Sequence, residues 1–305
     1  MLLQRTISGK ITLTGLGLHT GKKVKLKLYP AGSDEGIVFH RTDIKGHTPI
    51  KAELKNVSAL ENATCLGKGN EQIFTVEHLL AALYGMGINN VHCELDGPEV
   101  PVMDGSSAPF IFILSETGIR DLSKERKFLV IKEPLKVQHQ EKWAAIYPST
   151  SLIIDSTIDY DHPVIKKQQE RFVFSCENFI NEVSRARTFG MLKDLDYLQS
   201  RGLAKGCSLD NVLALDEFSV INKEPLRYEK EFVKHKILDS VGDLSLLGMD
   251  LVGEVVSYRS GHYLNNLLCQ EIMKNPDAYE ILSASDLKEE VKHKFRLPVA
   301  IASSY

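Results

Sequence analysis

A stripe of polar residues interrupts an apolar helical pattern at residues 232–248, FVKHKILDSVGDLSLLG. His235, Asp239 and Asp243 follow one another in steps of four, which places their side chains above one another on one face of a helix. Aspartate is unfavourable inside a helix, and burying two carboxylates among apolar residues is costly unless a cation neutralises them. The stripe therefore predicts a bound cation, either a metal ion or a basic side chain. A solvent-exposed helix face would show the same spacing.

A third metal ligand is expected from another part of the chain, because a catalytic zinc site uses three protein ligands and keeps one open position. His78 is the best candidate, since it lies in the first turn of a second helix predicted from TVEHLLAALYGMG, with Thr75 as its expected cap. Metalloproteases place a glutamate beside a ligating histidine as a general base, and Glu77 has that position here. A first-turn carboxylate favoured by the helix dipole is an equally good reading of Glu77.

His262 is a candidate proton donor. It follows Ser-Gly in the segment YRSGHYLNN, and we expect it in a loop after a strand. Asp243, the carboxylate of the stripe that ligation does not require, would keep His262 protonated, because a neighbouring negative charge raises the pKa of an imidazole. The chain has no P-loop, Gly-x-Gly-x-x-Gly or Gly-x-Ser-x-Gly motif, so nucleotide hydrolysis and serine-triad chemistry lack support.

The composition is that of a soluble globular protein. The chain of 305 residues is 43% hydrophobic and 25% charged, and its net charge of −3 argues against nucleic acid as the main ligand. No stretch resembles a signal peptide or reaches the ~18 apolar residues of a membrane span. The five cysteines are widely spaced and form no Cys-x-x-Cys pair, which argues against a disulfide framework and a cysteine zinc site. We expect a reduced, cytoplasmic protein without stable membrane insertion, and a monomer by default.

The pattern along the chain predicts an α+β protein of two similar domains. Strand patterns around one clear helix fill residues 1–124, charge dominates 119–127, and strands and helices resume over 125–285. Both halves contain Val, any residue, His and an apolar run that ends at glycine, followed by an apolar strand, which indicates a duplicated unit. An inserted segment is expected at about 190–222. Residues 286–305 form a charged tail that we expect to be partly disordered.

Several long motifs carry a resemblance to a known family. They are GLGLHTG, TVEHLLAALYGMGINN, VPVMDGSSAPF, SRARTFG, RYEKEFVKHKILDSVGDLSLLG and SGHYLNN. In their order and spacing they resemble UDP-3-O-acyl-N-acetylglucosamine deacetylase, the zinc amidase of lipid A biosynthesis in Gram-negative bacteria. The resemblance extends from about Leu3 to about Glu280 and leaves the charged tail outside it. It implies two similar domains, each a sheet packed against a pair of helices, with the active site between them.

The resemblance implies a metal set of His78, His235 and Asp239. The implied metal is Zn²⁺, one ion per chain, and Fe²⁺ is the alternative, since this ligand set does not distinguish the two. The implied reaction is hydrolysis of an acetamide to acetate and a free amine.

The resemblance also assigns the catalytic roles. Glu77 is the implied general base, and His262, held charged by Asp243, is the implied proton donor. Lys236 and Thr188 match positions that assist the substrate carbonyl. Activity is expected to rise and then fall with pH, because Glu77 must be ionised while His262 is protonated.

The implied substrate is a UDP sugar that carries a 3-O-acyl chain, so the protein needs an apolar groove. By resemblance the inserted segment forms the acyl passage, although an amphipathic helix packed on the core would show the same pattern. Lys142, Tyr160 and Arg259 are the candidates for the UDP end, where they would supply charge and ring stacking. The apolar candidates are Phe189, Leu192, Leu195 and Leu198.

Two other functions share parts of this pattern. A zinc amidase acting on another acetylated sugar or amide would use the same catalytic residues and would differ only in the acyl groove. A non-catalytic protein with a structural metal is the alternative from another class. Such a site is normally closed by a fourth protein ligand, which the set of three does not include.

Overall fold

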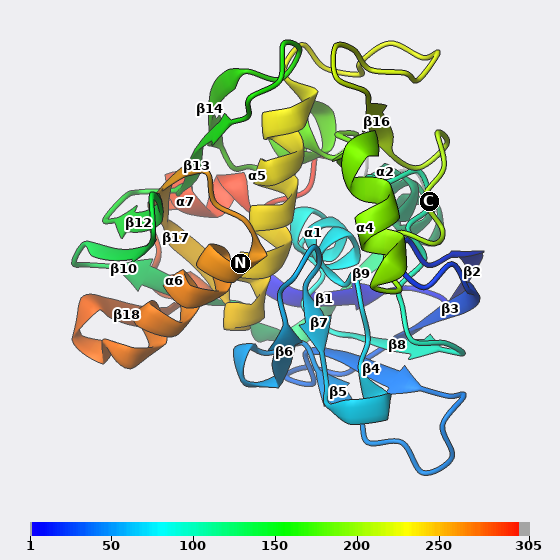
Figure 1. The fold of residues 1–305 in the computed structure, drawn as a ribbon. Helices are drawn as coiled ribbons and strands as arrows, with labels where there is room; N and C mark the ends of the chain where they lie inside the picture. The colour runs from blue at the N-terminus through cyan, green and yellow to red at the C-terminus, as the bar shows by residue number, and fades with distance from the viewer. Residues whose placement is uncertain (1, 299–305) are drawn as a thin grey trace.

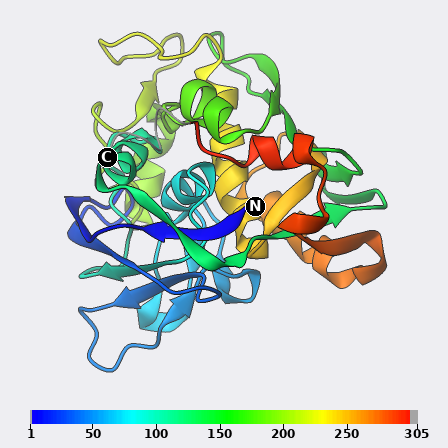
Figure 2. The same cartoon turned by 180° about the vertical axis from the view of Figure 1, so that it is seen from behind.

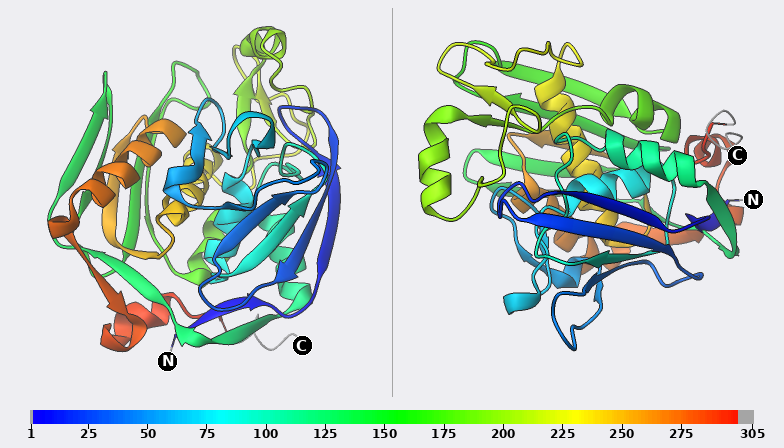
Figure 3. Two further views of the ribbon diagram at one scale, coloured as in Figure 1. Left: turned by 90° about the horizontal axis from the view of Figure 1, so that it is seen from below. Right: turned by 90° about the vertical axis from the view of Figure 1, so that its right-hand side faces the viewer.

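The computed structural model describes residues 2–298 and shows an α+β protein, which confirms the predicted fold class. Strands form two large sheets and three small pairs, and the longer helices lie between the large sheets (Figure 1; Figure 3, left). This layered arrangement buries the apolar faces of both sheets against helices.

The first large sheet comes from the N-terminal part of the chain. Its strands, in order across the sheet, are β2 (Ile11–Leu16), β3 (Lys23–Pro30), β8 (Val91–Leu95), β4 (Ile37–Arg41) and β5 (Ile50–Lys51). Only the pair of β4 and β8 is parallel. Along β3, Val24 and Leu26 are buried while Lys23 and Lys25 are exposed, so one face of the sheet packs on the helices and the other meets water.

The second large sheet has seven strands from the C-terminal part. They are β10 (Lys127–Ile131), β11 (Leu135–His139), β12 (Lys142–Tyr147), β13 (Leu152–Asp159), β14 (Lys167–Val173), β17 (Asp250–Tyr258) and β18 (Tyr279–Ser283). The long strand β17 is central, because it pairs with β10, β12 and β13. It ends just before His262 and so carries that residue to the site.

Three short pairs complete the β structure. They are β1 (Leu3–Ile7) with β9 (Ile119–Glu125), β6 (Val57–Ala59) with β7 (Cys65–Leu66), and β15 (Phe189–Met191) with β16 (Leu213–Leu215). The first pair runs across the back of the molecule (Figure 2). The charged segment expected at the domain boundary therefore forms a strand paired with the N-terminus, and the division into two similar domains stays a prediction.

The described helices differ widely in length. They are α1 (Glu77–Gly85), α2 (Ala108–Thr117), α3 (Cys176–Asn178), α4 (Leu195–Ser200), α5 (Glu231–Leu244), α6 (His262–Lys274) and α7 (Glu289–Lys294). The helix predicted around the stripe is α5. The expected cap of α1 was wrong: Val76 precedes the helix, and Thr75, at φ +58°, donates its hydroxyl to the Glu99 carboxylate at 2.8 Å instead. The carboxylate is the stronger acceptor.

Helices α1 and α5 approach closely at a glycine. A Cβ atom at Gly242 of α5 would lie 2.2 Å from the carbonyl oxygen of Glu77, so only glycine permits this contact. The contact brings the start of α1 beside the polar stripe of α5. One continuous cluster of buried apolar residues, including Leu80 of α1 and Val241 of α5, extends across both halves of the chain.

Part of the charged tail, residues 286–298, is folded, and the expectation of partial disorder for the tail stays a prediction. These residues include α7, and Phe295 is buried with its carbonyl accepting a hydrogen bond from Arg126 at 3.1 Å. Residues 299–305 lie outside the described part of the chain. Within residues 2–298, no helix has the length and apolarity needed to cross a bilayer, and all five cysteines are free thiols.

Candidate active site

Three buried side chains meet where α1 and α5 are in contact. Nε2 of His78 lies 3.5 Å and Nε2 of His235 lies 3.4 Å from the same oxygen, Oδ1 of Asp239. The three side chains offer ligand atoms within 4.8 Å of one another, and the residues are 3%, 1% and 2% exposed respectively. Tertiary packing thus brings together the metal set expected from the resemblance, from positions far apart in the chain.

The donor atoms of this group suit a divalent metal ion. Nδ1 of His235 lies 3.0 Å from the carbonyl oxygen of Ala186, which can only accept, so Nδ1 carries the hydrogen and Nε2 presents a lone pair. Burial lowers the pKa of His235 to about 3, which keeps this imidazole neutral. Oδ1 of Asp239 is buried and has no hydrogen-bond partner among residues 2–298. A buried carboxylate oxygen without a partner, beside two imidazole nitrogens, is a zinc-type donor set.

The second oxygen of Asp239 is paired with a lysine. Nζ of Lys236 donates to Oδ2 at 2.9 Å. Burial by itself would raise the pKa of Asp239, but the Lys236 ammonium beside it helps to hold that pKa well below its usual value. The carboxylate is therefore ionised, as a metal ligand must be.

Glu77 and His262 lie beside the triad, at the first positions of α1 and α6. Glu77 is the first residue of α1. The sequence predicted His262 in a loop, but it is the first residue of α6. Nε2 of His262 lies 3.9 Å from Oε1 of Glu77 and 4.0 Å from Oδ2 of Asp239. Burial raises the pKa of Glu77. A buried carboxylate and an imidazole thus lie close to each other beside the triad.

Asp243 lies behind His262, as the sequence predicted. Its Oδ2 lies 2.9 Å from Nδ1 of His262 and accepts from Nδ2 of Asn265 at 2.8 Å, while its Oδ1 accepts from the Thr64 hydroxyl at 2.5 Å. Burial by itself would lower the pKa of His262, but Asp243 raises it to about 9. His262 is therefore protonated at neutral pH. The sequence analysis missed Thr64 and Asn265, and only the position of Asn265 one turn after His262 signalled a role.

A cavity of about 600 Å³ opens from this group, and most of the predicted residues line it. The predicted residues in its wall are Glu77, His78, Lys142, Tyr160, Thr188, Phe189, Leu198, His235, Lys236, Asp239, Arg259 and His262. Leu192 does not line this cavity. It is 42% exposed and borders a separate hollow with Asp161 and His162, at the start of a short 3-10 helix that follows β15.

Comparison with known proteins decides the family. The family model of UDP-3-O-acyl N-acetylglycosamine deacetylase matches residues 4–274, which is most of the chain. This chain belongs to that family.

Curated relatives agree with this assignment over nearly their whole length. The UDP-3-O-acyl-N-acetylglucosamine deacetylase of Sodalis glossinidius (strain morsitans) is 43% identical over 289 residues, which cover 94% of this chain and 95% of the relative. The enzyme of the same name from Teredinibacter turnerae is 46% identical, covering 93% of this chain and 94% of the relative. That of Histophilus somni (strain 129Pt) is 42% identical, covering 99% of both.

Membership confirms the function that the resemblance implied. The chain is an enzyme, a hydrolase that cleaves an amide bond, and its reaction is the deacetylation step of lipid A biosynthesis. The family is one of metalloenzymes, and within residues 2–298 the buried side chains of His78, His235 and Asp239 form a group that can hold a metal ion.

The structure also shows residues of this deacetylase that the sequence analysis did not select. His19 is buried in the cavity wall, its Nδ1 accepts from the backbone N–H of Ala204 at 3.4 Å, and its Nε2 has no partner among the described residues. Its motif GLGLHTG was noticed, but nothing in the spacing indicated a direction for the side chain. The apolar part of the wall includes Leu18, Leu60, Phe189, Met191, Leu198, Ala204, Cys207, Val212 and Leu264. Of the leucines expected in the groove, only Leu198 is among them.

Proposed function

We propose that this chain hydrolyses the N-acetyl group of UDP-3-O-acyl-N-acetylglucosamine with zinc held by His78, His235 and Asp239. The position of Glu77 and His262 beside the buried triad, in the wall of one cavity, carries the proposal. When bound, zinc supplies Lewis-acid polarisation of a carbonyl and lowers the pKa of water towards ~7. Fe²⁺ is the alternative metal, because two imidazoles and a carboxylate suit both ions.

The different surroundings of Glu77 and His262 suit them to act as base and acid respectively. Glu77 removes a proton from the attacking water, and its raised pKa makes it a better base than an exposed carboxylate. The departing amine needs a proton, and Nε2 of His262 supplies it while Asp243 holds Nδ1. Separation of the two functions onto α1 and α6 lets both act on one substrate bound between them.

Negative charge develops on the carbonyl oxygen as water attacks. Thr188 and Lys236 line the same cavity and are placed to stabilise that charge. Lys236 donates to Asp239 at 2.9 Å, so its ammonium group is held beside the triad.

The cavity offers different surroundings to the two ends of the substrate. Leu18, Leu198 and Val212 supply apolar surface for the 3-O-acyl chain. Lys142, Tyr160 and Arg259 supply cations and a ring for the UDP group, and Phe189 lies beside Tyr160 with ring centroids 5.6 Å apart. Leu192 is not part of this proposal, because it borders the separate hollow.

We infer that the protein acts as a monomer in the cytoplasm. The triad, the base and the acid all come from one chain, so no second copy is needed to complete the site. The free cysteines of the described chain suit a reducing compartment.

The test is a zinc titration of metal-stripped protein while acetate release from UDP-3-O-acyl-N-acetylglucosamine is followed. Activity that rises to a maximum near one zinc per chain supports the substrate and the single site together. Folded protein that releases no acetate at any zinc level contradicts the proposal. A rate unchanged when the 3-O-acyl group is shortened would instead favour an amidase for other acetylated sugars. Closed four-coordinate zinc by X-ray absorption would favour a non-catalytic metal protein.

A further inference from the structure

The segment 185–188 passes directly behind the metal site. The carbonyl oxygen of Ala186 receives the Nδ1–H of His235 at 3.0 Å and so determines which nitrogen of that ligand faces the metal. Two residues later the side chain of Thr188 lines the cavity, and its backbone N–H donates to the carbonyl of Gly105 at 2.8 Å. The position of this segment therefore affects both a metal ligand and the cavity wall.

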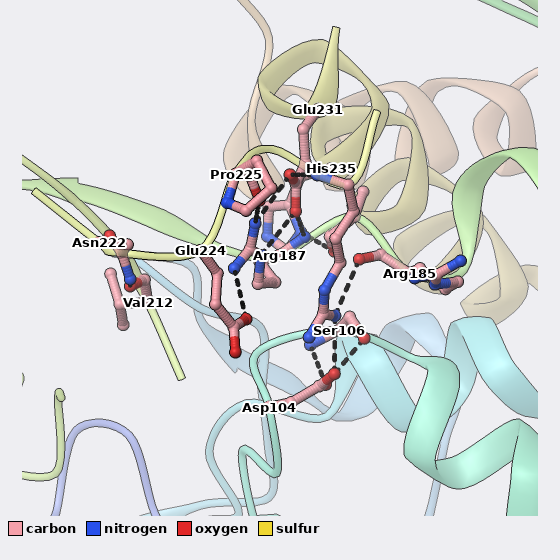
Figure 4. Close-up of polar contacts among 12 residues, drawn as sticks. Asp104, Ser106, Arg185, Arg187, Val212, Asn222, Glu224, Pro225, Glu231 and His235 are labelled. Atoms are coloured by element: carbon pink, nitrogen blue, oxygen red, sulfur yellow. Dashed lines mark hydrogen bonds and ion pairs between the residues drawn. The ribbon is translucent and has the colours of Figure 1, made fainter. Parts of the chain in front are cut away.

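A buried ion pair holds the segment in place (Figure 4). The Glu231 carboxylate, at 0% exposure, accepts from the backbone N–H, Nε and Nη2 of Arg187 at 3.0, 2.8 and 3.1 Å. It also accepts from the backbone N–H of Arg227 at 2.6 Å. Four donors on one buried carboxylate, two of them from a single guanidinium, give a geometrically specific contact.

The contact continues to the other half of the chain. The Nη1 of Arg227 donates to the carbonyl of Arg185 at 3.1 Å and to Oδ2 of Asp104 at 2.7 Å. The loop of Asp104 also includes Ser107, whose hydroxyl donates to the carbonyl of His78 at 2.8 Å. Figure 4 shows Arg187 and Glu231 above Asp104, with Arg185 beside them.

Glu231 extends the stripe that the sequence analysis found. It stands four residues before His235, so both side chains project from the same face of α5 towards residues 185–188. One helix face therefore carries a residue that fixes the segment, the histidine that the segment orients, and the Asp239 ligand.

We propose that Arg187 and Glu231 are positioning residues of the metal centre. Their ion pair fixes the carbonyl of Ala186 against Nδ1 of His235, and neither residue is a ligand or lines the cavity. The inference rests on the metal site proposed above. Loss of a group that orients a ligating histidine typically weakens metal binding 10–100-fold.

The test measures metal binding to the full-length protein after the metal has been removed. Zn²⁺ affinity is obtained by competition with a chelator, and the Co²⁺ absorption spectrum reports ligand geometry. Glu231→Gln removes the charge at nearly constant size and should raise Kd about 10–100-fold and change the Co²⁺ bands. Arg187→Lys keeps the charge but loses the two-pronged contact, and it should raise Kd to a smaller extent. It also carries the test if Glu231→Gln does not fold.

The chain offers a matched control in a second buried ion pair. Arg126 donates to Asp250 from Nε at 2.7 Å and from Nη2 at 2.6 Å, at the other end of α1 and α5. Asp250→Asn should lower stability to urea while Kd and the Co²⁺ spectrum stay as in the wild type. Wild-type Kd and spectrum in both Glu231→Gln and Arg187→Lys would overturn the proposal, and so would an equal change in Asp250→Asn. If the wild-type protein binds neither Zn²⁺ nor Co²⁺, the metal site proposed above is wrong, which is a different result from failure of the positioning role.

Discussion

At the scale of single residues, two carboxylates of the same type have different surroundings. Asp239 and Asp243 stand one turn apart on α5, and both are buried. Among residues 2–298, Oδ1 of Asp239 has no hydrogen-bond partner, which suits a metal ligand. Asp243 has each oxygen engaged, by Thr64 on one side and by Asn265 and His262 on the other. An occupied carboxylate is suited to hold an imidazolium rather than a metal ion.

The division of roles predicts different losses in three variants. Asp239→Ala should lose bound metal and activity together, because it removes a ligand. His262→Ala should keep its metal but lose kcat by ~10²–10⁴-fold, the usual contribution of a general acid. Glu77→Ala should resemble His262→Ala. Metal content and the rate of acetate release would be measured on each, and loss of metal from His262→Ala would show that the roles are wrongly divided.

The pH dependence of activity should report the pair of His262 and Asp243. His262 must be protonated to act, so kcat/KM should fall as pH rises through its pKa of about 9. Asp243→Asn removes the negative charge that raises this pKa, so the alkaline limb should move to lower pH by at least about one unit. A pH–rate profile of both proteins decides this. An alkaline limb that stays at the wild-type pH in Asp243→Asn would assign that limb to another group.

At the scale of elements, the site depends on how closely two helices approach. The contact at Gly242 places the first turn of α1, with Glu77 and His78, against the stripe of α5. The backbone at Gly105 lies similarly close to residue 211, because a Cβ on Gly105 would lie 2.1 Å from the carbonyl oxygen of Asn211. The φ of Gly105 is +83°. Both glycines serve close backbone approach rather than flexibility.

Gly242→Ala should therefore lower both the stability of the protein and its affinity for zinc, although Gly242 is not a ligand. The added methyl group would force α1 and α5 apart, with an expected loss of ~1–3 kcal/mol in the free energy of unfolding and weaker zinc binding. Urea unfolding and zinc competition measure the two effects. Gly9→Ala is the control, because its Cβ would meet only a side-chain methyl of Thr117 at 3.4 Å. Equal effects in the two variants would show that helix spacing does not matter.

At the scale of the whole molecule, the metal site joins distant parts of the chain. His78 comes from the N-terminal part, while His235 and Asp239 come from the C-terminal part. A metal that binds this group stabilises only the state in which both parts are packed, and the unfolded chain has no such site. Folding and metal binding are therefore linked.

Zinc should raise the free energy of unfolding by about 2.7 kcal/mol when free zinc is 100 times Kd. Denaturation in zinc and in chelator measures the difference. His235→Ala should abolish this increase, because it removes one of the three ligands. A His235→Ala protein that zinc stabilises as much as the wild type would place the relevant metal elsewhere.

The residues that share one helix face could be predicted from their spacing in the sequence. Contacts between residues far apart in the chain could not. Helical spacing in the sequence indicates the stripe of α5, and the structure brings the ligand atoms of His78, His235 and Asp239 within 4.8 Å of one another. Their role as metal ligands stays a prediction. The position of Leu192 outside the cavity was not visible in the sequence, because the spacing of the leucines does not indicate which of them faces the groove. Thr75 does not cap α1, because its hydroxyl donates a hydrogen bond to Glu99, which is distant in the sequence.

The sequence by itself determined the α+β class, the helix that carries His235, Asp239 and Asp243, and the chemistry that these residue types permit. These properties depend on residues a few positions apart and on the cost of burying charge. Only the tertiary structure decided that His78 meets Asp239, that Thr64 holds Asp243, and that Glu231 and Arg187 fix the segment behind His235. Those contacts join residues 44 to 179 positions apart, and packing of the whole chain selects them.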